Sequence, residues 1–174
     1  MSNLKNQMDL LWKAPEDVIR SSNLARYKGW VSERFNIPVE DYSRLYQWSL
    51  SDRESFWESL LTFFDVRYDG KYRRVCSTDP MPYVKWFEGI SLNYAEHVFR
   101  NSNSEHPALI AFSENRDVKH WSWKELESRT ACIQNLFHRL KLQPGDRVAA
   151  YMANIPEASA ALLACVSSGL IWSS

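Results

Sequence analysis

The 174-residue sequence is poor in glycine, and its five glycines form no phosphate-binding loop. Neither G-x-G-x-x-G nor G-x-x-x-x-G-K-[ST] occurs, and no G-x-S-x-G elbow presents a nucleophilic serine. Ser167 and Ser168 precede Gly169 without the Lys and Thr of a phosphate loop, so this stretch predicts only the end of a helix. The sequence therefore supplies no catalytic residue, and we assign none.

Cysteine and histidine are also scarce. The three cysteines are widely spaced without a C-x-x-C pair, and the four histidines form neither H-x-H nor H-x-x-x-H. This pattern excludes a disulfide framework and a zinc site, and we assign no metal ligand. We expect a reducing, cytoplasmic compartment, because free thiols persist there.

An excess of charge of one sign is missing as well. Lys plus Arg and Asp plus Glu each number 21, so the net charge is +0 and neither a nucleic-acid nor a membrane-surface partner is expected. No apolar run reaches about 18 residues, which predicts no transmembrane helix. Residues 1–17 lack the apolar core of a signal peptide. With 45% hydrophobic and 24% charged residues, the composition is that of a globular protein.

Aromatic residues are plentiful, with eight each of Trp, Tyr and Phe, mostly in the first hundred positions. Apolar spacing predicts a helix over Pro15–Phe35 and a short helix near residues 42–49. A Ser51–Glu54 capping box then predicts a helix that buries Phe56, Leu60 and Phe63 on one face. We interpret the aromatics as the core of a helical region, the alternative being a docking surface.

A long ordered loop is predicted over Arg67–Gly89, where Gly and Pro interrupt any period, followed by a helix over Ser91–Arg100. The polar stretch at residues 101–107 marks a domain boundary. We therefore expect a helical N-terminal region at 1–103 and the start of a second, incomplete domain at 104–174.

The second region predicts mixed α/β structure. A hairpin at residues 108–123 is followed by a helix that a Ser122–Glu125 capping box starts and that ends near Leu140. An apolar strand at 147–153, a helix from Pro156 to Gly169 and a strand at 170–174 then form a strand–helix–strand unit. Such a unit predicts a right-handed crossover within a parallel sheet, which needs further strands and covering helices.

Several stretches together resemble the adenylate-forming ligases. These are "GDRV" followed by Asn154 and Glu157 of an N-x-x-E pattern, the "WFEGISLN" segment, and "TW-EL"-like "SWKEL". Leu170 departs from the Ala that usually ends the helix in that superfamily. The segments "WSLSDRESFW", "LNYAEH" and "IWSS" are similar to the acyl-CoA synthetase branch and, within it, to the subfamily that activates acetoacetate. The resemblance runs from about Trp12 to Ser174.

That resemblance implies an AMP-binding enzyme that uses ATP, CoA and Mg²⁺ to join acetoacetate to CoA through an acyl-adenylate. The family's phosphate loop, nucleotide contacts and catalytic lysine have no counterpart in these residues, so the segment by itself is expected to be inactive. It also implies that Trp172, Ser173 and Ser174 are only neighbours of a CoA channel, and we favour the alternative that they form the end of a core strand.

Two other interpretations stay open at this stage. The segment could belong to an enzyme for acetate, propionate or another short acid, since no acyl pocket is recognisable in it. Alternatively, it could be a non-catalytic interaction module rich in aromatic residues. The ligase interpretation expects the remainder of a longer chain as the partner and exposed apolar surface that permits self-association.

Overall fold

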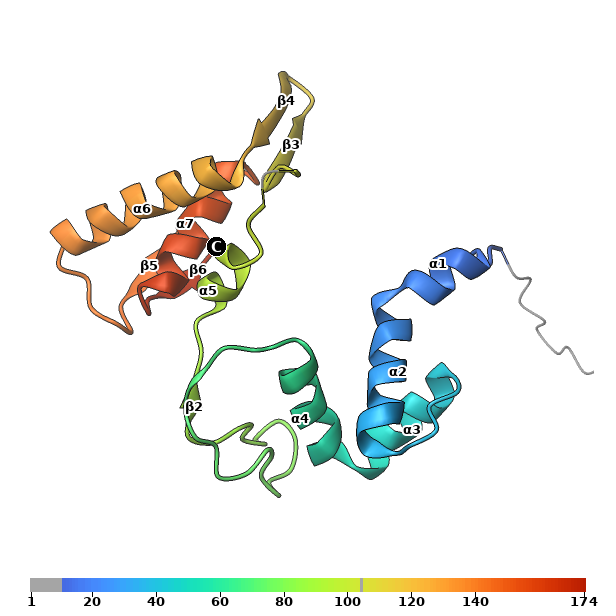
Figure 1. The fold of residues 1–174 in the computed structure, drawn as a ribbon. Coiled ribbons are helices and arrows are strands. Elements are labelled where there is room, and N and C mark those ends of the chain that lie inside the picture. Colours follow the sequence, from blue (N-terminus) through green and yellow to red (C-terminus); the bar gives the residue numbers. More distant parts are fainter. Residues whose placement is uncertain (1–10, 104) are drawn as a thin grey trace, which may run out of the picture. The chain divides into compact units, whose positions relative to one another are not determined.

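The computed structural model describes residues 11–103 and 105–174. The chain divides into two compact units: the first runs to Val66 and includes Arg74–Trp86, and the second comprises Arg67–Arg73 and Phe87–Ser174 (Figure 1). Residues 1–10 lie outside the described residues, and they make up most of the stretch that lacks a signal-peptide core. Ser104, at the predicted start of the second domain, also lies outside them. The domain boundary at 103–104 stays a prediction.

Four helices form most of the first unit: α1 (Glu16–Ser21), α2 (Asn23–Phe35), α3 (Tyr42–Ser51) and α4 (Arg53–Phe63). The prediction of one continuous helix over Pro15–Phe35 was wrong at Ser22. Its backbone is extended, with ψ of 151°, and its hydroxyl accepts a hydrogen bond from the Ala25 N–H at 3.1 Å. Ser22 therefore caps a new helix instead of continuing the first.

An aromatic core holds the helices of the first unit together. The buried members of this core are Tyr27, Val31, Val39, Leu45 and Trp48, with Phe56, Leu60 and Phe63 of α4 packed against them. The predicted apolar face of α4 is thus confirmed. Buried aromatic rings supply large apolar areas, and edge-to-face contacts such as Tyr27–Phe63, with centroids 5.0 Å apart, add specific geometry.

The helix α4 does not begin where the sequence predicted. Ser51 is the last residue of α3, and Asp52 is the N-cap of α4, its carboxylate accepting from the Ser55 N–H at 3.1 Å. The predicted Ser51–Glu54 capping box was therefore wrong. An Asp one residue later competes for the same role, and Asp is as good a cap as Ser.

The second unit begins with a short antiparallel pair, β1 (Asp69–Gly70) and β2 (Ile90–Ser91), followed by α5 (Tyr94–Phe99). The predicted long ordered loop over Arg67–Gly89 is interrupted by β1, and the helix predicted to start at Ser91 begins instead at Tyr94. Gly70 and Gly89 have φ of 95° and 108°, and a Cβ on Gly70 would lie 2.4 Å from the Gly89 carbonyl oxygen. The two chain segments can approach this closely only because neither glycine carries a side chain.

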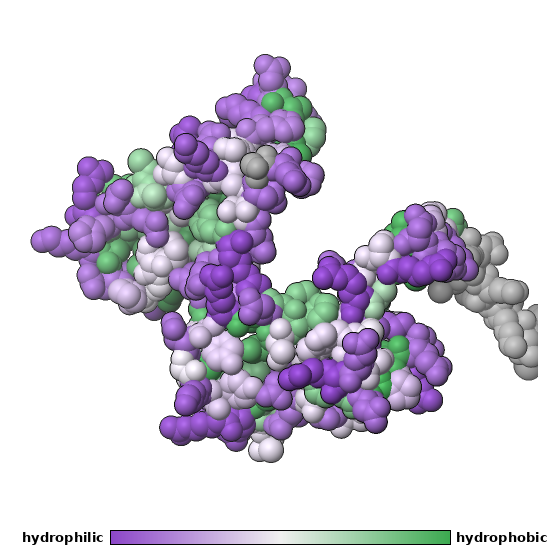
Figure 2. Space-filling view, in the orientation of Figure 1, coloured by the Kyte–Doolittle hydropathy of each residue, from purple (hydrophilic) through white to green (hydrophobic). Residues whose placement is uncertain are grey.

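The hairpin and its following helix are as predicted. Strands β3 (Leu109–Ser113) and β4 (Arg116–Trp121) pair antiparallel, and α6 runs over Trp123–Arg139. The Ser122 hydroxyl caps α6 by accepting from the Glu125 N–H at 3.1 Å. One face of the hairpin stays exposed and apolar through Ile110, Phe112 and Val118, as the apolar colouring on the hairpin in Figure 2 shows.

The predicted strand–helix–strand unit is confirmed. β5 (Arg147–Ala149) and β6 (Ile171–Ser173) pair in parallel, joined through α7 (Pro156–Ser167). α7 packs on α5 and α6 around Ala95, Leu126, Ala160 and Leu163. β5 is shorter than predicted and is not buried on both faces, because the two strands have no further strand beside them among the described residues. No helix in the described part of the chain has the length and apolarity to span a membrane.

Candidate functional site

The carboxyl ends of β5 and β6 meet at one edge of the parallel pair. The Ala150 N–H donates to the Ser173 carbonyl at 2.8 Å, so the two chains stay paired up to this edge. Beside it lies a hollow of about 430 Å³ between the strand ends and the first turns of α7. In open α/β sheets this edge is where ligands bind. Its lining residues are Ala150, Tyr151, Met152, Ala153, Asn154, Ala158, Ser159, Leu162, Trp172 and Ser174.

The predicted residues at the chain's end take different positions at this edge. Trp172 is half-buried, packs against the core around Ala164 and Cys165, and also lines the hollow. Ser174 lines the hollow, whereas Ser173 is paired with Ala149 in the ladder and is not part of the lining. Successive strand residues face opposite sides, which separates Ser173 from its two neighbours.

The N-x-x-E residues lie where β5 connects to α7. Asn154 lines the strand-edge hollow and also a neighbouring hollow of about 320 Å³ beneath the hairpin. Glu157, in the first turn of α7, lines the second hollow together with Arg116 and Lys119 of the hairpin. A carboxylate at a helix N-terminus is stabilised by the helix dipole. The two residues of the pattern therefore lie at two neighbouring hollows, with Asn154 lining both and Glu157 lining only the second.

A tight turn aligns the starts of the two strands. The Gly145 N–H donates to the Gly169 carbonyl at 2.9 Å, and the Ile171 N–H donates to the Asp146 carbonyl at 2.8 Å. Gly169 has φ of 70°, and a Cβ there would lie 3.3 Å from Pro144. Both the "PGD" turn and the glycine that ends α7 are thus required for the register of the parallel pair.

Beneath this edge the core is closed. Ala164 and Cys165 of α7 are fully buried, and burial raises the pKa of the Cys165 thiol. A thiol kept neutral in this way is a poor nucleophile. Cys165 is therefore part of the packing beneath the site and does not supply chemistry to it.

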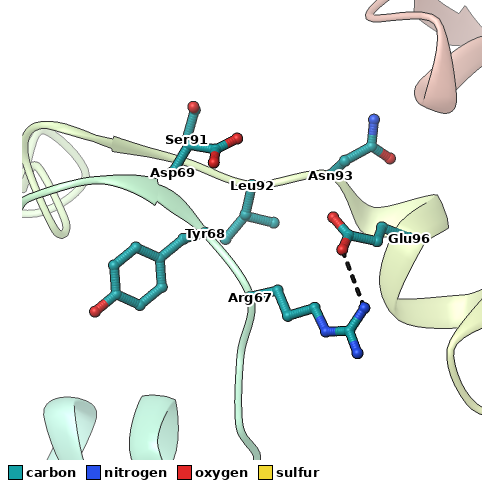
Figure 3. A pocket seen from close by; sticks show the side chains of 7 residues that line it. All are labelled: Arg67, Tyr68, Asp69, Ser91, Leu92, Asn93 and Glu96. Carbon is teal, nitrogen blue, oxygen red and sulfur yellow. Dashed lines mark hydrogen bonds and ion pairs between the residues drawn. The ribbon is translucent and has the colours of Figure 1, made fainter.

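A third hollow, which is polar and has a volume of about 330 Å³, lies between the β1–β2 pair and α5 (Figure 3). Arg67 lies across from α5, and its guanidinium pairs with Glu96 at 3.3 Å. The Arg67 backbone lies 3.0–3.1 Å from the His97 Nε2. Asn93, also in the lining, points its amide away from the Arg67–Glu96 pair.

Sequence reasoning did not single out Asn93. Its side chain contacts both the first turn of α5 and the last carbonyls of α7, which lie 73 and 74 residues further along. An Asn immediately before a helix is a capping signal that could have drawn attention to it. The long-range contact leaves no signal in the sequence.

The strand-edge hollow is lined by no acidic or basic side chain, so it does not fit an ATP or Mg²⁺ site. No group of three or more His, Cys, Asp or Glu side chains in residues 11–103 and 105–174 is arranged to hold a metal ion. The strand-edge hollow combines the aromatic and apolar walls of Tyr151, Met152 and Trp172 with the polar groups of Asn154 and Ser174. This lining suits a slender ligand of mixed polarity better than a polyphosphate.

Comparisons with known proteins agree with this geometry. The family model of the acetyl-coenzyme A synthetase N-terminus matches residues 42–98, and that of the AMP-binding enzymes matches residues 97–173. Acetoacetyl-coenzyme A synthetase of Rhizobium meliloti (strain 1021) is 32% identical over 164 residues, covering 94% of this chain and 25% of that protein. Malonamoyl-CoA synthetase of Penicillium aethiopicum is 29% identical over 171 residues, covering 94% of this chain and 23% of that protein.

A solved structure gives the same result in three dimensions. Acetoacetyl-CoA synthetase from Streptomyces lividans superimposes with a TM-score of 0.87 and 35% sequence identity, over 95% of this chain and 26% of that one. The chain belongs to the acyl-CoA synthetase branch of the AMP-binding enzymes. Within that branch it is homologous to the N-terminal part of acetoacetyl-CoA synthetases, and it spans about a quarter of the length of the relatives it matches.

Proposed function

We propose that the chain is the N-terminal segment of an acid–thiol ligase that converts acetoacetate and CoA to acetoacetyl-CoA at the expense of ATP. The observation that carries this proposal is the similarity to acetoacetyl-CoA synthetases over 94–95% of the chain, in sequence and in fold. The segment's part in such an enzyme is structural: it supplies the first parallel strand pair and the strand-edge hollow. The setting would be cytoplasmic, consistent with three free cysteines.

The chemistry of the proposed reaction explains why an adenylate is needed. A carboxylate is a poor acyl donor, because displacement would have to expel oxide. Attack of the carboxylate on the ATP α-phosphate releases pyrophosphate and leaves an acyl-adenylate, from which the CoA thiol displaces AMP. Cations offset the charge that develops on the phosphate. ATP and Mg²⁺ would be held by residues outside this segment.

We propose that Trp172, Ser173 and Ser174 are neighbours of the CoA channel. The support is the hollow beside Trp172 and Ser174, whose apolar wall and polar rim suit the pantetheine arm of CoA. Ser173 contributes only through its strand pairing with Ala149.

A related acid is the second candidate substrate. Malonamate, which the name of the Penicillium relative implies, shares with acetoacetate a carbonyl on the third carbon. We therefore propose a short acid with a carbonyl at that position as the substrate class, in preference to acetate or propionate.

A chimera tests the proposal. The chain would replace the corresponding quarter of the Streptomyces lividans enzyme, and acetoacetate-dependent ATP–pyrophosphate exchange and CoA thioester formation would be measured with acetoacetate, acetate and propionate. We expect a folded chimera to be active with acetoacetate, and the 174-residue chain alone to show no exchange. A folded but inactive chimera, or a preference for acetate, contradicts the proposal. ATP–pyrophosphate exchange by the isolated chain would contradict the expectation that the catalytic residues lie outside this segment.

The exposed apolar face of the hairpin, Ile110, Phe112 and Val118, bears on the alternative of an interaction module. A segment built to pack against the remainder of its own chain should self-associate when alone. A stand-alone module should be a cooperative monomer or a defined dimer. Sedimentation velocity of the isolated chain separates these outcomes, and a well-behaved monomer favours the module.

A further inference from the structure

Asn93 makes two different kinds of hydrogen bond from one side chain. Its Oδ1 accepts from the Ala95 N–H at 3.0 Å and caps α5. Its Nδ2 donates to the carbonyls of Val166 and Ser167 at 3.4 and 3.3 Å, at the C-terminal end of α7. The last carbonyls of a helix have no partner within the helix, so donors from elsewhere determine how that end is held.

A second side chain holds the same turn. Gln134 of α6 donates from Nε2 to the Ser167 hydroxyl at 2.8 Å, and that hydroxyl donates to the Ala164 carbonyl at 3.0 Å. The end of α7 is thus fastened to α5 through Asn93 and to α6 through Gln134. Both contacts are partly buried, which protects them from competition by water.

The position of this turn determines where β6 begins. Only Ser168, Gly169 and Leu170 separate the end of α7 from β6, and Gly169 and Ile171 are bonded directly to the turn that starts β5. A shift at the end of α7 is therefore passed to the ladder within a few residues. At the other end of that ladder lie Trp172 and Ser174, at the strand-edge hollow.

We infer that Asn93 is a positioning residue for the strand-edge site: it fixes the end of α7, and through it the register of β6 beside the CoA-facing hollow. This inference rests on the proposed function for its meaning in catalysis, but its structural half stands without it. Asn93 touches neither the hollow at the strand edge nor a substrate, and it acts through β6.

Asn93→Asp separates the two roles of the side chain. The carboxylate still caps α5, because it can accept from the Ala95 N–H, but it cannot donate to the α7 carbonyls and repels them. Asn93→Ala loses both functions. Ser122→Ala is the matched control, since it removes the same kind of side-chain cap from a different helix, α6.

Amide hydrogen exchange of the 174-residue chain by NMR measures the result without any ligand. In both Asn93 variants we expect the Ile171 and Ala150 amides, which report on the ladder, to exchange about two- to tenfold faster, as for a lost hydrogen bond. The Ala95 amide should exchange faster only in Asn93→Ala. Gln134→Ala should also speed exchange of the Ile171 and Ala150 amides. It replaces the Asn93 variants in this test if they fail to fold.

Two results would overturn the inference. If the Ile171 and Ala150 amides exchange at the same rate in Asn93→Asp as in the parent chain, Asn93 is only a helix cap. If Ser122→Ala loosens the ladder equally, the effect is general destabilisation. In the active chimera, Asn93→Asp should raise the KM for CoA about threefold or more while acetoacetate-dependent pyrophosphate exchange is unchanged. An inactive parent chimera would refute the proposed function and leave the exchange result standing.

Discussion

Removing the Tyr27 hydroxyl and removing the Ser59 hydroxyl should have unequal effects on stability, although the two groups share one hydrogen bond. Their oxygens lie 2.6 Å apart inside the aromatic core, and the Ser59 hydroxyl also lies 2.6 Å from the Phe56 carbonyl. A serine has one hydroxyl proton. Because Ser59 uses it on the carbonyl, Tyr27 must be the donor to Ser59.

Tyr27→Phe leaves the serine satisfied, since its own proton still reaches the Phe56 carbonyl. We expect a loss of about 1 kcal/mol, the net value of one hydrogen bond. Ser59→Ala leaves the tyrosine hydroxyl without its acceptor in a core where Tyr27 is only 5% exposed. An unsatisfied buried donor costs about 1–3 kcal/mol, so this variant should be the less stable one.

Urea denaturation followed by tryptophan fluorescence measures both variants and the double variant. The double variant should lose little more than Tyr27→Phe alone, because no donor is then left without an acceptor. If Tyr27→Phe proves as costly as Ser59→Ala, or the two losses simply add, the assigned direction of the hydrogen bonds is refuted.

The same pair predicts a pH dependence. Burial raises the pKa of the Tyr27 hydroxyl above its ordinary value. The folded protein therefore holds this proton more tightly than the unfolded chain, and the resulting stability is fully present below about pH 10 and is lost as the pH rises through the folded-state pKa. The stability difference between the parent chain and Tyr27→Phe should shrink above pH 10. A difference that stays constant would contradict the assignment.

Three further predictions follow from glycine conformation, helix capping and cysteine exposure. Gly89→Ala should cost about 1–3 kcal/mol in thermal unfolding, because its φ is 108° and the new Cβ would meet a carbonyl oxygen at 2.6 Å, whereas Gly29→Ala in the open middle of α2 should stabilise the chain by about 0.5–1 kcal/mol. Asp52→Ala should lower the free energy of unfolding by about 1 kcal/mol and Ser51→Ala by less than about 0.5 kcal/mol. Equal losses would instead support Ser51 as a cap of α4. Under native conditions a thiol reagent should modify one cysteine rapidly, the exposed Cys132, and Cys132→Ser should abolish that fast phase.

Much of the fold could be predicted from sequence because its signals are local. The α6 cap at Ser122, the hairpin and the Pro156–Gly169 helix each depend on residues a few positions apart, and each is confirmed. Where two local signals competed, as at Ser51 and Asp52, the pattern could not decide between neighbouring caps.

The missed features depend on contacts between distant residues. The β1–β2 pair is two residues long on each side, too short for an alternating pattern, and exists because Gly70 and Gly89 permit a close crossing. Asn93 is an ordinary helix cap in the sequence, and only folding brings the end of α7 to its amide. The sequence predicted the strand that contains Trp172. That Trp172 both packs against the core and lines the hollow could be seen only in the structure.

The parallel pairing of β5 with β6 also sets an order of events during folding. Arg147 and Ile171 are 24 positions apart, whereas the hairpin strands are joined by a tight turn. Closing the longer loop costs more entropy, and parallel pairing must wait until α7 has formed and packed. The hairpin and α6 should therefore be in place first. The strand-edge site should be the last part of this chain to assemble and the first to open under denaturant.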